Sequence, residues 1–402
     1  MPTGPVAELR TTAAIRERAQ FLLHRARCGD SSWFRIDDTA LPEAAGYVAD
    51  LTTRRFPGLD IPFHSRWRHF EAGGVDRTTE LRSRLGELDG AGQARAMIDL
   101  AVISVLLDAG SGPDWSYLEA GSGQSFTRSE GLGVASWHAF TDGLFSSDPA
   151  QPLQADAAGL IALDAARLAD AFQICPTNPL VGFDGRVQLL HRLGAALAAQ
   201  PEFGARGRPG GLFDVVVVDN AVSAHTILSA LLSSLSGIWL ADNMIDGESV
   251  GDCWPHPAVP GSGLTRGWIP FHKLSQWLTY SLLEPFQWAG VTVTGLDALT
   301  GLPEYRNGGL LLDTGVLMLG ESVYSTRIWS VADELIVEWR ALTVALLDEL
   351  AILVRDRLGV DATQLPLACV LEGGTWAAGR ELAHTLRGGL PPLTITSDGT
   401  VF

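Results

Sequence analysis

Apolar residues recur at intervals of three and four along most long segments of this chain, and this spacing constrains the fold more than any other feature. It places apolar side chains on one face of a helix. It predicts helices over residues 13–27, 94–107, 160–172, 181–199, 221–235, 272–288 and 332–358. A chain of 402 residues that is 46% hydrophobic can bury a large core. We therefore expect a mainly α-helical protein.

Strand-like segments are short and few. They are FDVVVVD at residues 213–219, VTVT at 291–294 and the tail from residue 393, in which Asp398 and Gly399 favour a hairpin turn. We expect one helical domain over residues 1–402. Glycine and proline cluster at residues 202–212. That cluster is the place where the domain can subdivide, into an N-terminal helical segment of residues 1–205 and a C-terminal segment of residues 206–402 that carries most of the candidate catalytic residues.

The formal net charge of −17 limits the kinds of partner. Such a charge repels nucleic-acid phosphates and anionic lipids, so we expect no nucleic-acid polymer and no membrane as a partner. A small anionic substrate remains compatible, because a few Arg or Lys side chains set the field inside a pocket. The four cysteines lie far apart and the N-terminal segment lacks the apolar core of a secretory signal, which favours a cytoplasmic protein. The sequence does not determine the oligomeric state.

Metal-ligand patterns are absent from the sequence. Its nine histidines show neither H-x-x-x-H nor H-E-x-x-H spacing, and its cysteines show no C-x-x-C pair. The sequence therefore predicts no metal site, and nothing in it calls for another cofactor.

A carboxylate, a phenol and a guanidinium stand in a row at Glu304, Tyr305 and Arg306, between Pro303 and the pair Gly308–Gly309. Proline disfavours a helical conformation for the residue before it, so Glu304 is expected at a bend or a helix start. Apolar residues follow, which would partly desolvate the carboxylate. Glu304 can then act as a base or nucleophile, or it can form an ordinary surface ion pair with Arg306.

Three further segments combine charged and aromatic side chains. If residues 66–71 are extended, alternation puts Trp67 and His69 on one side. The helix expected from His272 could seat a phosphate at its N-terminus beside Lys273, or leave that lysine in solvent. Glu372, Trp376 and Arg380 follow one another at steps of four and are expected on one helical face.

Seven motifs spread over nearly the whole chain resemble those of the uracil-catabolism family of fungi and bacteria, long described as a domain of unknown function. They are SRWRHF (65–70), DLAVISVLLDAGSGPDW (99–115), RSEGLGVAS (128–136), NPLVGFDGR (178–186), PFHKLSQWLTYSLLEP (270–285), LTGLPEYRNGGLLLDTGVL (299–317) and LEGGTWAAGRE (371–381). The resemblance implies a place in the pathway that opens the pyrimidine ring of uracil after ribosylation and releases urea.

The order of the motifs is also similar to that of the queuosine salvage proteins, which are N-glycosylases acting on queuosine 5′-phosphate. This resemblance implies a multi-helix fold like that of DNA glycosylases. Their Phe-Ala-Asp-Tyr-Arg motif corresponds to residues 302–306, their Phe-Tyr-Lys-Arg-Ala-Gln motif to 271–276, their Glu-x-Arg motif to 338–340, and the end of their Leu-Trp-x-x-Ala-Arg motif to Trp376 and Arg380. Their aspartate is replaced here by Glu304, which is longer by one methylene.

The second resemblance implies a role for each matching residue. Glu304 would lie beneath the anomeric carbon and stabilise its positive charge in the transition state. Asp313, Asp252 or Glu130 would supply an acid on the opposite face. The implied substrate-binding residues are Lys273, Tyr305, Arg306 and His272 at a 5′-phosphate, Trp67 or Trp376 over the base-like end, and Gln276, Arg68, His69, Glu338, Arg340 and Arg380 beside them.

We therefore expect an N-glycosidase that hydrolyses the N-ribosidic bond of a phosphorylated ribosyl-urea or a related nucleotide breakdown product. Its partner would be a small phosphorylated ribosyl substrate. One alternative is a ureido amidohydrolase of the same pathway, which would need a metal or a cysteine nucleophile. The other is a non-catalytic module that binds a nucleotide.

Overall fold

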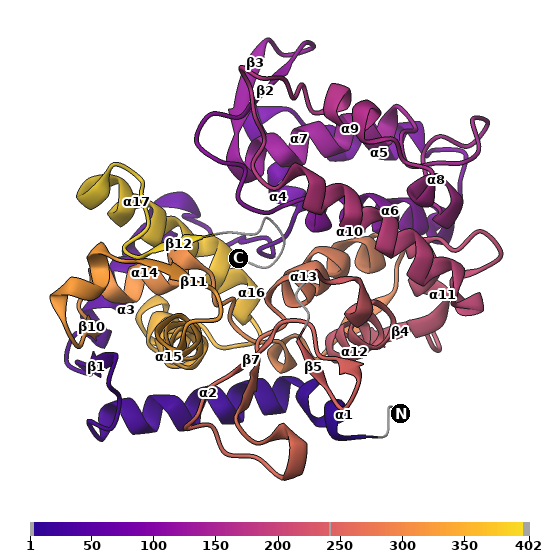
Figure 1. Ribbon diagram of the computed structural model, residues 1–402. Helices are drawn as coiled ribbons and strands as arrows, with labels where there is room; N and C mark the ends of the chain where they lie inside the picture. The colour runs from indigo at the N-terminus through magenta and orange to yellow at the C-terminus, as the bar shows by residue number, and fades with distance from the viewer. Residues whose placement is uncertain (1–3, 241–242, 397–402) are drawn as a thin grey trace. The chain divides into compact units, whose positions relative to one another are not determined.

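The computed structural model describes residues 4–240 and 243–396, and the described chain is mainly α-helical (Figure 1). This confirms the predicted fold class, while the likeness to DNA glycosylases stays a prediction. The chain divides into two compact units. Unit 1 comprises Met1–His64, Asn243–Gln276 and Gly295–Thr396, and unit 2 comprises Ser65–Asp242, Trp277–Thr294 and Ser397–Phe402. Residues 202–212 lie within unit 2, and a domain boundary there stays a prediction.

The helices of unit 1 gather around one long central helix. They are α1 (Pro5–Leu9), α2 (Thr12–Arg27), α3 (Leu41–Arg55), α14 (Tyr305–Asp313), α15 (Glu334–Leu358), α16 (Leu367–Val370) and α17 (Trp376–Arg387). Every residue of α15 from Leu335 to Leu347 is buried, as expected for a helix covered on all sides. Helices α2, α3 and α14 pack on it, and Figure 1 shows α15 nearly end-on among them.

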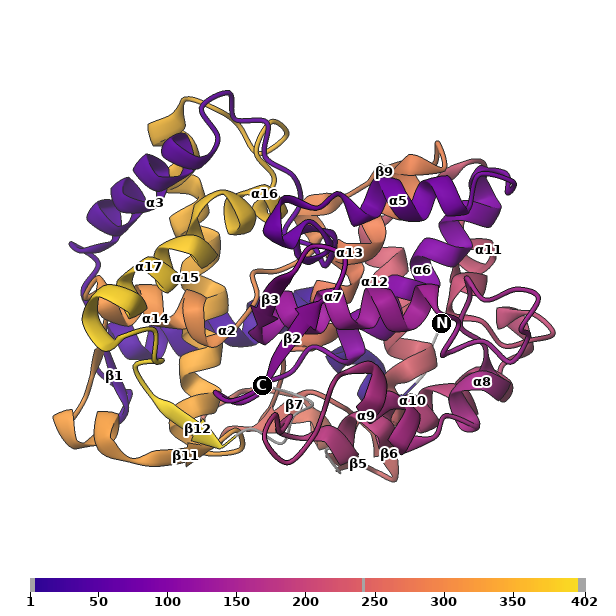
Figure 2. The same ribbon diagram turned by 90° about the horizontal axis from the view of Figure 1, so that it is seen from above.

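Two glycines let α14 approach its neighbours closely. A Cβ atom at Gly308 would lie 2.7 Å from the indole ring of Trp339 on α15, whose Nε1 donates to the Gly308 carbonyl oxygen. A Cβ atom at Gly379 of α17 would lie 2.1 Å from the carbonyl oxygen of Arg306. The pair α14 and α17 runs side by side in Figure 2. These two approaches fix the backbone that carries Arg306.

We expect Gly379→Ala to lower the free energy of unfolding by about 1–3 kcal/mol, because the added methyl group forces α14 and α17 apart. Urea denaturation followed by circular dichroism measures the change. Gly121→Ala is the control, since no described atom lies within 4 Å of a Cβ at Gly121. Its effect should stay within about 0.5 kcal/mol. Equal effects of the two changes would show that the close approach does not matter.

Unit 2 is built from shorter helices. They are α4 (Trp67–Phe70), α5 (Arg77–Arg84), α6 (Gly90–Leu106), α7 (Arg128–Thr141), α8 (Ala157–Ile161), α9 (Ala165–Ala171), α10 (Phe183–Ala198), α11 (Leu212–Val216) and α12 (Ala224–Leu235). Helix α6 packs against α7 and α10 (Figure 2). Helix α13 (Lys273–Trp288) contributes its first residues to unit 1 and the others to unit 2.

Asp99, a carboxylate on the otherwise apolar α6, ties three segments of unit 2 together. It is fully buried and accepts hydrogen bonds from the Arg208 guanidinium and from the backbone N–H groups of Gly210 and Ala155. Burial raises its pKa to about 6, against the opposing effect of Arg208. The carboxylate is thus a structural tie for the backbone of unit 2.

The strands form small two-stranded sheets within the described residues. Their bounds are β1 (Phe34–Ile36), β2 (Ser116–Glu119), β3 (Gln124–Thr127), β4 (Ala221–Ser223), β5 (Met244–Ile245), β6 (Glu248–Ser249), β7 (Cys253–Pro255), β8 (Trp268–Pro270), β9 (Thr292–Thr294), β10 (Leu317–Leu319), β11 (Ile328–Ser330) and β12 (Thr394–Thr396). The strand predicted at VTVT is confirmed as β9. The tail forms β12, which pairs in parallel with β11. The hairpin turn predicted at Asp398 and Gly399 lies outside the described residues.

The strand predicted at residues 213–219 is wrong. Residues 212–216 form helix α11, because Leu212, Phe213 and Val216 are buried at helical spacing and Phe213 stacks on Phe286 at 5.4 Å. Two predicted helices also have different bounds. Residues 160–172 belong to two helices, since the Asp164 side chain caps the second, and Ser223 caps the helix expected to begin at residue 221.

No helix among the described residues is long and apolar enough to cross a membrane.

Candidate functional site

Glu304 caps the N-terminus of α14. Its Oε2 accepts a hydrogen bond from the backbone N–H of Arg306 at 2.9 Å, and its Oε1 accepts one from Asn307 at 2.6 Å. The helix start predicted from Pro303 is therefore confirmed. The side chain is half-buried. Two amide donors thus hold the carboxylate in one orientation, and each carboxylate oxygen keeps a second lone pair for another partner.

Arg306 stacks on the indole of Trp376. Its guanidinium carbon lies 4.1 Å from the ring centroid, and its Nε donates to the Tyr305 hydroxyl at 3.1 Å. Arg380 approaches the same indole at 5.6 Å from one turn further along α17. Arg306 is buried, whereas Tyr305, Trp376 and Arg380 are half-buried. The structure thus brings five of the predicted residues together in unit 1, and we call them the Trp376 cluster: Glu304, Tyr305, Arg306, Trp376 and Arg380.

A histidine and a carboxylate extend this cluster. The π-helical turn Leu371–Thr375 precedes α17 and carries Glu372. His64 Nδ1 donates to Glu372 Oε2 at 2.9 Å, and Arg55 donates to Glu372 Oε1 at 3.2 Å and to the Gly373 carbonyl oxygen at 2.9 Å. The His64 ring lies 6.0 Å from that of Trp376. Three segments distant in sequence thus converge beside the same indole.

Two buried amides hold the loop before Glu304. The backbone N–H of Thr300 donates to Gln276 Oε1 at 3.5 Å, and Asn307 Nδ2 donates to the Leu302 carbonyl oxygen at 3.1 Å. Gln276 Nε2 and Asn307 Oδ1 are buried and form no hydrogen bond with a described residue. Such atoms are uncommon in proteins and often occur near functional sites. Gln276, predicted as a site residue, therefore lies against the loop that positions Glu304.

Asp252 and Arg340 form a buried ion pair elsewhere in unit 1. Both guanidinium contacts measure 2.8 Å, and Asp252 also accepts hydrogen bonds from Trp254 Nε1 at 2.7 Å and from the Lys273 backbone N–H at 2.9 Å. Burial alone would raise the pKa of Asp252, but these partners together hold it below its usual value. This favours the ionised carboxylate, which has no proton to donate, and the acid role of Asp252 stays a prediction. The N-terminus of α13, predicted as a phosphate seat, is occupied by this carboxylate, and the Lys273 side chain there is half-buried.

His272 is held by a backbone carbonyl oxygen at the end of α1. The residue is buried and its Nε2 donates to the Leu9 carbonyl oxygen at 2.9 Å. Burial lowers its pKa, which favours the neutral imidazole. A buried neutral ring bonded to a carbonyl oxygen does not attract a phosphate by charge, and the role of His272 in substrate binding stays a prediction.

Among the described residues, one group has its possible ligand atoms as close together as a metal site requires. It consists of His256, Glu334 and Glu338, whose ligand atoms lie within 4.8 Å of one another. His256 Nε2 donates to Glu338 Oε2 at 3.1 Å, and Ser31 donates to the other oxygen of Glu338. The backbone N–H of Ala258 donates to His256 Nδ1 at 3.3 Å. That bond places the imidazole proton on Nε2, where a metal would need a lone pair. We read His256, the predicted residue Glu338 and Ser31 as a hydrogen-bond network beside the exposed Glu334.

Asp313, the other predicted acid, lies at the C-terminal end of α14. Nine residues of helix separate it from the Glu304 cap by about 13 Å at 1.5 Å per residue. Paired carboxyl groups of glycosidases lie about 5–9.5 Å apart. Arg387 binds both oxygens of Asp313, at 2.7 and 2.6 Å. Asp313 is thus engaged by Arg387 at the far end of the helix from Glu304, and its catalytic role stays a prediction.

The remaining predicted residues belong to unit 2. Residues 67–70 form helix α4, so the extended conformation on which the alternation of Trp67 and His69 depended does not occur. Trp67 is fully buried, and its Nε1 donates to the Ser281 carbonyl oxygen at 2.8 Å. Arg68 donates to Glu284 at 2.8 Å, and His69 is buried edge-on against Trp277 at 5.7 Å. Glu130 is half-buried in the first turn of α7. Their roles in substrate binding stay predictions.

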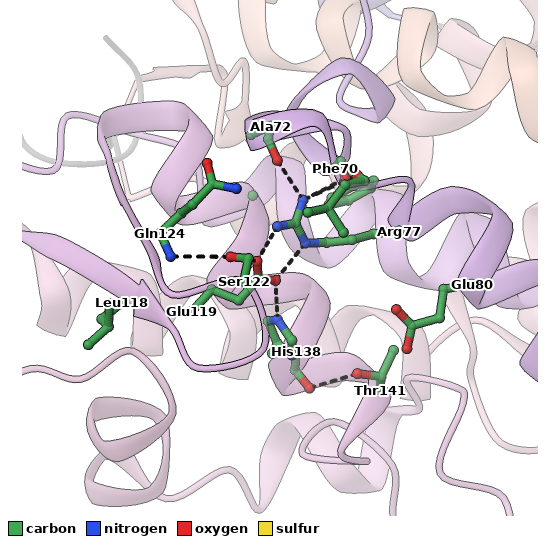
Figure 3. A network of polar contacts seen from close by, with 12 residues as sticks. Phe70, Ala72, Arg77, Glu80, Leu118, Glu119, Ser122, Gln124, His138 and Thr141 are labelled. Carbon is green, nitrogen blue, oxygen red and sulfur yellow. Dashed lines mark hydrogen bonds and ion pairs between the residues drawn. The ribbon is translucent and has the colours of Figure 1, made fainter.

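A third carboxylate–histidine pair lies in unit 2. Figure 3 shows Arg77 and His138 converging on Glu119, the last residue of β2. Arg77 binds both carboxylate oxygens, His138 Nε2 donates at 2.7 Å and Ser122 donates at 2.6 Å. Burial alone would raise the pKa of Glu119, but the four donated hydrogen bonds lower it to about 2. This network fastens the hairpin of β2 and β3 to the segment around α4.

A hollow of about 570 Å³ lies on unit 2, and none of the predicted site residues lines it. Its polar side chains already serve the fold. Asp156 caps α8 through the Gly159 N–H at 2.9 Å, and Arg206 pairs with Asp148 at 2.9 Å. The hollow therefore offers little chemistry to a ligand.

Sequence reasoning missed the most suggestive group beside the Trp376 cluster. Arg55 and His64 lie more than 300 positions from Glu372, and no local spacing connects them. The one available signal was Glu372 itself, which precedes two glycines and stands four residues before Trp376. That signal indicated a polar helical face and gave no partner for the carboxylate.

The chain is similar to curated proteins over its whole length. It is 39% identical to the protein named "Protein urg3" of Schizosaccharomyces pombe over 415 aligned residues, which cover 100% of both chains. It is 36% identical to the protein named "Uracil catabolism protein 4" of Lachancea kluyveri, with 99% of each chain covered. A family model described as "Protein of unknown function (DUF1688)" matches residues 8–402. The family model matches nearly the whole chain, and both relatives align with at least 99% of it. This chain therefore belongs to that family.

Proposed function

We propose that this protein hydrolyses the N-ribosidic bond of a phosphorylated ribosyl-urea, or of a related nucleotide breakdown product, in uracil catabolism. The pathway is suggested by the name of the relative "Uracil catabolism protein 4". The reaction is suggested by the motif at residues 302–306, which is similar to that of the queuosine salvage N-glycosylases.

One observation carries the proposal. The Glu304 carboxylate is held by two backbone N–H groups next to Arg306, whose guanidinium stacks on the half-buried Trp376. Cleavage of an N-ribosidic bond builds positive charge on the anomeric carbon and the ring oxygen. A carboxylate fixed before the reaction stabilises that charge without having to reorganise, and it can orient the attacking water.

The other members of the Trp376 cluster suit the rest of such a substrate. Trp376 offers some of its aromatic face, on which a planar ureide can stack. Arg380, half-buried beside that face, offers a guanidinium to a 5′-phosphate. Tyr305 is also half-buried and offers a hydroxyl that already accepts a hydrogen bond from Arg306. A sugar held between them would present its anomeric carbon to Glu304.

The direct test is to incubate the purified protein with N-ribosyl-urea 5′-phosphate and, separately, with UMP. We expect ribose 5-phosphate and urea in equal amounts from the first compound. Ammonia or carbamate without ribose 5-phosphate would overturn the proposal in favour of an amidohydrolase. Saturable binding without any product would overturn it in favour of a non-catalytic nucleotide-binding module.

A further inference from the structure

His64 is held in one orientation by a chain of charged contacts. Its Nδ1 donates to Glu372 Oε2 at 2.9 Å, and Arg55 binds the other carboxylate oxygen at 3.2 Å. Arg55 also donates to the carbonyl oxygens of Glu372 and Gly373, so it fixes the turn from which Glu372 projects. A carboxylate at Nδ1 orients an imidazole and leaves Nε2 as the nitrogen that faces a reacting group. That is the arrangement of a histidine used for proton transfer.

The second ring nitrogen of His64 is available. Within the described residues none is hydrogen-bonded to Nε2, and Nε2 is not among the buried polar atoms that lack a partner. The residue as a whole is 6% exposed, so the accessible area of the ring is small. A substrate atom could therefore meet Nε2 in a largely desolvated place.

Two other histidines are paired with buried glutamates, and neither offers the same chemistry. In the pair of His256 with Glu338, both ring nitrogens are engaged, because Ala258 N–H donates to Nδ1. In the pair of His138 with Glu119, the described ring contacts of the histidine are to Tyr117 and Trp137 of unit 2. Of these three histidines, His64 is the one whose ring lies next to the Trp376 cluster.

The position of His64 follows from its neighbours. Its ring lies 6.0 Å from the Trp376 indole, on which Arg306 stacks at 4.1 Å. The backbone N–H of Arg306 in turn holds the Glu304 carboxylate. His64 and Glu304 are thus linked through one guanidinium and one indole.

The proposed hydrolysis needs an acid, because a ureide nitrogen leaves poorly unless it is protonated. Two of the three carboxyl groups predicted for this task already have partners in unit 1, and the third, Glu130, belongs to unit 2. Asp313 is bound by Arg387 at the other end of α14, and Asp252 accepts four hydrogen bonds. Within unit 1, His64 combines an oriented ring, an available nitrogen and contact with the Trp376 cluster.

We infer that His64 is the proton donor to the leaving nitrogen, an inference that rests on the proposed function and adds its acid. As the bond from the anomeric carbon to nitrogen breaks, its electron pair goes to nitrogen, which takes the proton from His64 Nε2. Water adds to the anomeric carbon on the side of Glu304, which accepts the proton that the water releases. Solvent then returns a proton from Glu304 to His64. The sum is substrate plus water giving ribose 5-phosphate and urea.

The test compares two leaving groups in the variant His64→Asn. An asparagine amide can still donate to Glu372 as Nδ1 does, but it has no equivalent of Nε2. On N-ribosyl-urea 5′-phosphate we expect a loss in kcat/KM of about a hundredfold to ten-thousandfold. On 4-nitrophenyl riboside 5-phosphate, whose phenolate leaves without protonation, we expect roughly unchanged activity, since no acid is needed there. Glu372→Gln should show the same contrast with a smaller loss.

His138→Gln is the matched control, since it alters a carboxylate–histidine pair in unit 2 and should leave both activities unchanged. Thermal unfolding monitored by circular dichroism shows whether each variant is folded. Equal losses on the two substrates for a folded His64→Asn protein would overturn the inference and leave the proposed function standing. A wild-type protein that releases ribose 5-phosphate from neither substrate would overturn both.

Discussion

Glu304→Gln should lower kcat for release of ribose 5-phosphate by roughly a thousandfold or more, equivalent to about 4 kcal/mol of transition-state stabilisation. The change removes the negative charge that the proposal sets against the cationic sugar, while the glutamine carbonyl oxygen can still accept one of the two capping hydrogen bonds. The Kd for substrate, measured by calorimetry, should change little. We therefore expect a large loss in kcat with the affinity for substrate retained.

Glu304 is also a helix cap, so its two roles must be separated. Asp89→Asn is the matched control, because Asp89 caps α6 through the Gly92 N–H at 2.7 Å and lies in unit 2. Both changes remove one charge from a helix N-terminus. Loss of a cap costs about 0.5–2 kcal/mol of stability and should not affect turnover. Full activity of a folded Glu304→Gln protein would exclude the carboxylate from the chemistry.

Glu119→Gln should lower the free energy of unfolding at pH 7 by about 3–5 kcal/mol, because it leaves Arg77 buried without its charged partner. Glu119 is 4% exposed, and its pKa in the folded protein is about 2, against 4.5 as the reference value. A lowered pKa means that ionised Glu119 stabilises the folded state above about pH 4.5. That contribution, about 3 kcal/mol, is lost as the pH falls from about 4.5 to 2.

Urea denaturation at pH 7 and at pH 3 measures both effects. The wild-type protein should lose some of its stability on acidification, and the difference between wild type and Glu119→Gln should shrink. Glu80→Gln is the control in the same unit, because Glu80 pairs with Arg84 on the surface, where an ion pair contributes little. A difference between wild type and Glu119→Gln that is the same at both pH values would contradict the assigned ionisation.

Local chemistry accounts for those features of the site that sequence could predict. Pro303 indicated a helix start, and Glu304 caps that helix. Trp376 and Arg380 were expected to be neighbours at a step of four, and they are, because both lie on α17. The spacing of apolar residues predicted the mainly α-helical class. In the structure those apolar residues form the buried faces of the helices.

Contacts between distant segments account for what sequence could not predict. Asp252 and Arg340 are 88 positions apart, and no pattern indicated that they would bind each other. Without that pairing, Asp252 resembled a free acid. The valines after Phe213 favoured a strand by propensity, but the burial of Phe213 against a distant aromatic ring overrode the local preference.

The π-helical turn at Leu371–Thr375 has a consequence for how this protein could arise and vary. A π turn holds one residue more than an α turn, so an ancestral insertion of a single residue can create it. Deleting one residue there would convert the turn to α-helix and rotate α16 and the start of the turn by about 100° relative to α17. Glu372 would then swing away from His64 while Trp376 stayed in place. Length in this turn, as much as residue identity, is therefore what we expect selection to preserve.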